Sequence, residues 1–146
     1  MIPLIVLALS FVVFWLTGFR VGYFADWQLA LRASLGVMFL LTASAHWGKR
    51  RPDLIRMVPR VFGNAGMWVT LTGAAEVLIA AGLQIPRVAS MVAALAAVML
   101  VCIIPANAKA ARERLTIGGR PVAGLGLRLG IQVVFLAALA AAGWPR

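Results

Sequence analysis

The chain has 146 residues, of which 63% are hydrophobic and only 12% are charged. Soluble domains carry about a quarter charged residues, so this composition excludes an ordinary soluble domain and indicates an integral membrane protein. The charge is mostly basic, with 14 Lys and Arg against 4 Asp and Glu and a net charge of +10. Because the cations cluster between apolar runs, we interpret them as signals for membrane orientation and as contacts for anionic lipid, and we expect no nucleic-acid partner.

The first of five apolar runs extends from Ile2 to Gly18, which is at the short end of the length that spans a bilayer. A secretory signal is the alternative interpretation. However, no Lys or Arg precedes the apolar core, and the segment from Phe19 to Tyr23 lacks a small-x-small cleavage site. We therefore expect residues 1–27 to form an extra N-terminal transmembrane helix followed by an aromatic loop.

The other four apolar runs cover residues 28–47, 65–83, 88–104 and 125–143. Alanine and glycine are frequent in these runs, and small residues let helix backbones approach closely in lipid. The pattern predicts an all-α membrane protein, with a four-transmembrane-helix bundle core formed by residues 28–146.

Two basic loops separate the runs and set the predicted topology. Their cations are Lys49, Arg50, Arg51, Arg56 and Arg60 in the first loop and Lys109, Arg112, Arg114 and Arg120 in the second. Two spans separate the loops, so both should lie on one side, and this excess of Lys and Arg predicts that the side is cytoplasmic. The other side has only Arg20, Arg87 and Arg146 outside the runs. We expect an inner (plasma) membrane protein with its N-terminus inside, its C-terminus outside and anionic lipid at the loops.

Glu76 lies near the middle of the run at 65–83, where lipid tolerates a charge least. Even lenient scales put an ionisable group at mid-bilayer at roughly 3 kcal/mol, so Glu76 should be neutral, paired with a cation or facing a polar cavity. Its candidate partners in a shared interior pocket are Arg32, His46, Asn107, Arg128 and Gln132. The two arginines are the best cations, although both can instead reach the interfaces, and the histidine can instead cap a helix end.

The chain contains few residues that could bind a metal or carry redox chemistry. Cys102 is the one cysteine and His46 the one histidine, which excludes an intrachain disulfide, a thiol-pair relay, a bis-histidine haem and a His-rich metal site within one chain. No metal site and no catalytic residue is predicted.

Taken together, the polar residues and turns from Arg32 to about Trp144 resemble the DoxX-like family of small membrane proteins. The resemblance depends on Arg32, Leu35-Gly36, Phe39, His46, Pro52, Met57-Val58-Pro59, Gly73, Glu76, Gly82-Leu83, Pro105-Ala106-Asn107, Leu127-Arg128-Leu129 and Gln132, in this order. It implies a four-helix core and an association with membrane redox chemistry, since relatives are linked to thiosulfate–quinone oxidoreductase subunits and to detoxification complexes that contain superoxide dismutase. The run from Ile2 to Gly18 lies outside this core.

Three functions remain open at this point. The first is a redox-linked membrane subunit whose pocket holds a quinone or a similar amphiphile, with electrons supplied by a protein partner. The second is a non-catalytic adaptor or assembly subunit, in which the polar groups fix helix register and the basic loops bind lipid or an acidic partner. The third is a small proton-coupled transporter with Glu76 as the carrier, which at this size would act as a homo-oligomer.

Overall fold

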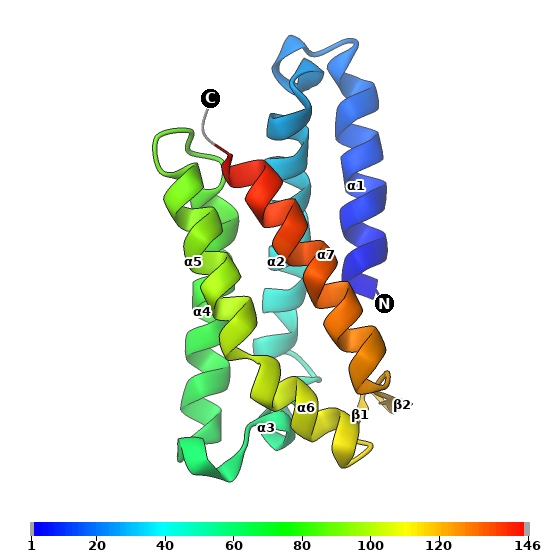
Figure 1. Ribbon diagram of the computed structural model, residues 1–146, viewed down its shortest axis with the longest axis vertical. Coiled ribbons are helices and arrows are strands. Elements are labelled where there is room, and N and C mark those ends of the chain that lie inside the picture. Colours follow the sequence, from blue (N-terminus) through cyan, green and yellow to red (C-terminus); the bar gives the residue numbers. More distant parts are fainter. Residues whose placement is uncertain (1, 145–146) are drawn as a thin grey trace.

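Helices make up most of the computed structural model, which describes residues 2–144 (Figure 1); Arg146 lies outside this range. The elements are α1 (Ile2–Gly18), η1 (Gly22–Ala25), α2 (Trp27–Trp47), α3 (Arg51–Met57), η2 (Arg60–Phe62), α4 (Ala65–Gly82), α5 (Ala89–Cys102), α6 (Ile104–Arg112), β1 (Thr116–Ile117), β2 (Arg120–Pro121) and α7 (Leu125–Gly143). Two long helices begin at residues that cap them: the Asp26 side chain accepts from Gln28 N, and the Asn64 side chain accepts from Met67 N.

Within the described residues, four helical segments are long and apolar enough to cross a membrane. They are α2, α4, the α5–α6 segment at 89–112, and α7, whereas α1 is apolar but shorter, with 17 residues. These four helices are compatible with the all-α membrane protein that the sequence predicts.

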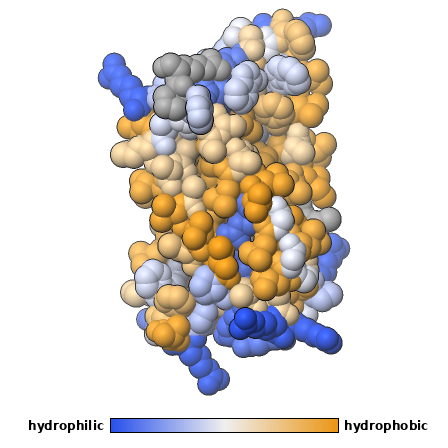
Figure 2. Space-filling view, viewed as in Figure 1, coloured by the Kyte–Doolittle hydropathy of each residue, from blue (hydrophilic) through white to orange (hydrophobic). Residues whose placement is uncertain are grey.

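The central helix of the bundle is α2. It packs against α1 on one side and α4 on the other, while α7 crosses in front of it and packs against α5 (Figure 1). The buried core contains Leu35 and Phe39 of α2, Leu83 just after α4, and Leu139 of α7. Hydrophobic side chains cover the middle of the molecule and hydrophilic ones gather at its two ends, with a small hydrophilic group visible at mid-height (Figure 2).

The two basic loops lie at the same end of the bundle, here called the basic end (residues 48–64 and 104–124; Figure 1). They contact each other directly: Lys109 Nζ donates to Arg56 O at 2.7 Å and to Val58 O at 2.9 Å, and Gly118 N donates to the Asp53 carboxylate at 2.7 Å. The second loop includes a small hairpin, β1–β2, whose two-residue turn is Gly118-Gly119 with φ of +59° and +75°. The prediction that both loops share one end is confirmed.

The predicted run at 88–104 corresponds to α5, and a second helix, α6, follows it. The helix breaks at Ile103, where α5 ends and α6 begins with Pro105 in its first turn. Proline lacks the N–H that a continuous helix needs, so the chain changes direction there. Near this break the Leu100 carbonyl accepts a hydrogen bond from Gln132, which is described below.

α2 and α4 approach each other closely at Gly73. A Cβ atom added there would lie 2.6 Å from His46 Cβ and 2.8 Å from His46 Cγ, so only glycine fits at this position. Because Gly73 has no side chain, α4 packs closely against the last turn of α2, and Glu76 lies beside His46.

Candidate functional site

Glu76 faces His46 across the contact between α4 and α2. Glu76 Oε2 lies 3.6 Å from His46 Nδ1, and the two side chains are only 12% and 11% exposed. The pairing follows from helix geometry, because Gly73 precedes Glu76 by three residues and therefore lies on the same face of α4. Thr42, one turn before His46 on α2, donates to Phe39 O and also interacts with the Glu76 carboxyl group.

The hydrogen bonds around His46 leave Glu76 incompletely bonded. His46 Nδ1 lies 3.1 Å from Thr42 O. A carbonyl oxygen only accepts, so Nδ1 carries the proton and Nε2 is the acceptor of the ring. The distance of 3.6 Å from Nδ1 to Glu76 is too long for a hydrogen bond, and Glu76 Oε2 is buried without a hydrogen-bond partner among the described residues.

A second polar group links α7 to the α5–α6 break. Arg128 Nη2 donates to Asn107 Oδ1, Asn107 Nδ2 donates to Gln132 Oε1 at 3.3 Å, and Gln132 Nε2 donates to Leu100 O. Leu100 lies at the end of α5, so Gln132 satisfies a carbonyl that the helix break exposes. Arg128 Nε is buried and, within residues 2–144, has no hydrogen-bond partner.

A third polar group lies at the opposite end of the bundle, at the C-terminus of α7. Arg32 Nε donates to Ala142 O at 2.8 Å, and Gln28 Nε2 donates to both Ala141 O and Trp144 O at 2.9 Å. A cation and an amide thereby satisfy the last carbonyls of the helix, where the helix dipole is negative.

The predicted convergence on one pocket is therefore found only in part. Glu76 meets His46, whereas Asn107, Arg128 and Gln132 form a separate network and Arg32 caps α7. Neither arginine forms an ion pair with Glu76 in the described part of the chain, and of the candidate partners it is His46 that lies beside Glu76. Backbone carbonyls at helix ends and at the α5–α6 break bind these side chains instead.

Three cations of the basic loops bond to other groups of the protein. Arg51 donates to His46 O, Gly66 O and Thr70 Oγ1, which ties the end of α2 to the start of α4. Arg56 pairs with Asp53, and Lys109 binds the last carbonyls of α3. Arg51 and Lys109 thereby bind carbonyls at the C-terminal ends of α2 and α3, where the helix dipole is negative.

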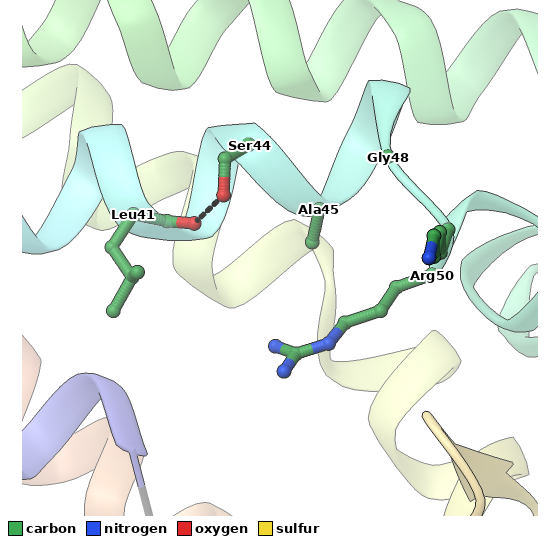
Figure 3. Close-up of a pocket in the computed structure, with 6 residues that line it drawn as sticks. Leu41, Ser44, Ala45, Gly48 and Arg50 are labelled. Carbon is green, nitrogen blue, oxygen red and sulfur yellow. Dashed lines mark hydrogen bonds between the residues drawn. The ribbon is translucent and has the colours of Figure 1, made fainter.

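Two open hollows are described, both at the basic end. One has a volume of about 440 Å³ and is lined by Pro59, Arg60, Lys109 and Glu113. The other, of about 270 Å³, is lined by Leu41, Ser44, Ala45, Gly48, Lys49 and Arg50 (Figure 3). Neither includes Glu76.

Two residues with clear roles escaped the sequence analysis. Thr42 supplies the carbonyl that fixes the His46 ring, and Gln28 caps a helix more than a hundred residues away. Spacing offered one signal, because Thr42 precedes His46 by four residues and so lies on its face of α2. The role of Gln28 had no local signal.

Comparison of the sequence with protein-family models finds a match to one family. The model of the family described as "Domain of unknown function (DUF8561)" matches residues 35–142, which begin within α2 and end one residue before the end of α7. No curated protein and no solved structure matches the sequence. Since the match covers well over half of the chain, the protein belongs to this family.

Proposed function

We propose that this member of the DUF8561 family is a redox-linked integral membrane subunit, of the DoxX-like type that its sequence resembles, with an intramembrane site for a quinone or a similar amphiphile. The observation that carries the proposal is the buried Glu76 Oε2, which has no hydrogen-bond partner within residues 2–144. A buried polar atom without a partner costs about 1–3 kcal/mol, so a site that retains one is explained by a ligand group that bonds to it.

The chemistry of the pair suits a carbonyl-bearing amphiphile. Glu76 can hold a proton and donate it to a ligand oxygen, whereas His46, with its Nδ1 proton bound by Thr42 O, presents a second titratable group beside it. The surrounding helices supply apolar walls, as ligand sites generally require. Electrons for reduction of a bound quinone would come from a protein partner, because a single cysteine and a single histidine supply no redox relay.

A specific observation favours a second candidate, a non-catalytic adaptor. Arg32, Asn107, Arg128 and Gln132 all bond to backbone or to one another across helices. Such bonds fix helix register without any ligand. If the protein is an adaptor, Glu76 binds no ligand, and substitution of Glu76 does not change the function.

The proposal includes an orientation in the membrane. The basic end faces the cytoplasm, because Lys and Arg predominate there, and α1 crosses the bilayer as a fifth span. The N-terminus is then cytoplasmic and the C-terminus lies outside the inner membrane.

The proposal is tested by purification in mild detergent, followed by extraction and mass spectrometry of small molecules. Wild-type protein should retain quinone in a stoichiometric amount, and Glu76→Leu should lose it. The matched control is Glu113→Leu, since Glu113 is an exposed acid at the basic end. Glu76→Leu should unfold at a temperature no lower than that of the wild type, because the substitution removes a buried oxygen that has no hydrogen-bond partner within residues 2–144. Retention of quinone by Glu76→Leu, or its absence from the wild type, would favour the adaptor.

A further inference from the structure

The smaller hollow at the basic end combines an apolar wall with a cationic rim. Leu41, Ser44 and Ala45 lie at helical spacing on one face of the last two turns of α2, and Gly48 follows the helix. Lys49 and Arg50 follow directly after the helix. Figure 3 shows the Arg50 side chain extending back along α2, so that its guanidinium lies on the side of the helix where Ala45 and Leu41 project. The cleft is therefore amphipathic, and its polar group lies at the end of a span.

The two cations of this cleft differ from their neighbours in having no internal partner. Arg51, Arg56 and Lys109 are bonded within the protein. No ion pair or hydrogen bond of the Lys49 ammonium or the Arg50 guanidinium is present in the part of the chain that the structure describes. Both side chains are exposed, and Ser44 Oγ already donates to Leu41 O. The cleft thus offers free positive charge and no compensating acid.

We propose that this cleft binds the headgroup of one anionic phospholipid, with its phosphodiester on Arg50 and Lys49 and an acyl chain along Leu41 and Ala45. A guanidinium presents donors in a fork that matches phosphate oxygens, and an ammonium adds a point charge. The apolar wall belongs to α2, one of the helices long and apolar enough to cross a membrane, and a soluble anion would leave that wall uncovered. The site is independent of the His46–Glu76 proposal, because it shares no residue with it.

The test is native mass spectrometry of the detergent-purified protein, titrated with phosphatidylglycerol or with zwitterionic phosphatidylcholine. The charge variant is Lys49→Gln together with Arg50→Gln. Its matched control, Arg112→Gln together with Arg114→Gln, removes two exposed cations from the same end that do not line the cleft. A second variant, Ala45→Phe, fills the apolar wall without changing any charge.

Each cation near an anionic headgroup strengthens binding about fivefold, so the charge variant should bind phosphatidylglycerol about 25-fold more weakly. Ala45→Phe should also weaken binding, whereas the control should match the wild type, and phosphatidylcholine should bind weakly to all. An equal loss in the control would show diffuse attraction to the basic end and overturn the proposal. Unchanged binding in the charge variant would overturn it too, as would displacement of the lipid by an equimolar soluble glycerol phosphate.

Discussion

Gly73→Ala tests the helix contact that brings Glu76 to His46. The added Cβ would lie 2.6 Å from His46 Cβ and 3.0 Å from the Trp47 ring, against an optimal separation of about 3.5–4.0 Å between carbon atoms. His46 Cβ is fixed to the backbone and cannot rotate away, so α2 and α4 must separate. Overpacking of this kind costs about 1–3 kcal/mol, and the better helix propensity of alanine offsets about 1 kcal/mol of that cost.

The matched control is Gly130→Ala on α7. A Cβ there meets no atom within 4 Å, so this variant should keep the propensity gain of up to about 1 kcal/mol. The difference in free energy of unfolding between the two variants is therefore the packing cost, about 1–3 kcal/mol. Unfolding by sodium dodecyl sulfate in mixed micelles, followed by circular dichroism, measures it. If Gly73→Ala were as stable as Gly130→Ala, the close approach of α2 and α4 would be refuted.

Two further predictions concern the opposite end of the bundle and the orientation in the membrane. Arg32→Gln should lower the free energy of unfolding by about 1.5–3 kcal/mol, because Ala142 O loses a charged donor; Arg87→Gln, which changes an exposed cation at the same end, should have little effect in the same unfolding assay. Single cysteines at Arg56 and Arg87, in a Cys102→Ala background, should react with an impermeant thiol reagent from opposite sides of the membrane, and only the Arg87 position should be labelled in intact cells. Labelling of both positions from outside would contradict the proposed topology.

The sequence was sufficient for those features of the fold that depend on local patterns. The five apolar runs correspond to α1, α2, α4, α5 and α7 of the structure. Arg128 and Gln132 are four residues apart and therefore share one face of α7, and both side chains meet Asn107. Apolar runs and helical spacing are local patterns, so these features can be predicted without knowledge of tertiary contacts.

The sequence was insufficient for the choice of polar partners. Arg32 and Arg128 were candidate partners of Glu76 by charge and His46 by its polar ring, and only the rotation and separation of the helices place His46 beside Glu76. The hydrogen bonds of Arg51 to His46 O and Gly66 O depend on the placement of the end of α2 beside the start of α4. The hydrogen bond of Gln132 to Leu100 O depends on the placement of α7 beside the break between α5 and α6. Each of these depends on tertiary geometry.

The proposed site between α2 and α4 is tested most directly by photo-crosslinking. A photoreactive quinone analogue is added to the protein in lipid nanodiscs, and the labelled peptides are mapped by mass spectrometry with and without excess unlabelled quinone. The account predicts competed labelling of residues 42–47 and 72–80, the segments around Thr42, His46 and Glu76, and loss of that labelling in Glu76→Leu. Labelling that falls on other segments, or that excess quinone does not reduce, would contradict the claim that His46 and Glu76 form a ligand site.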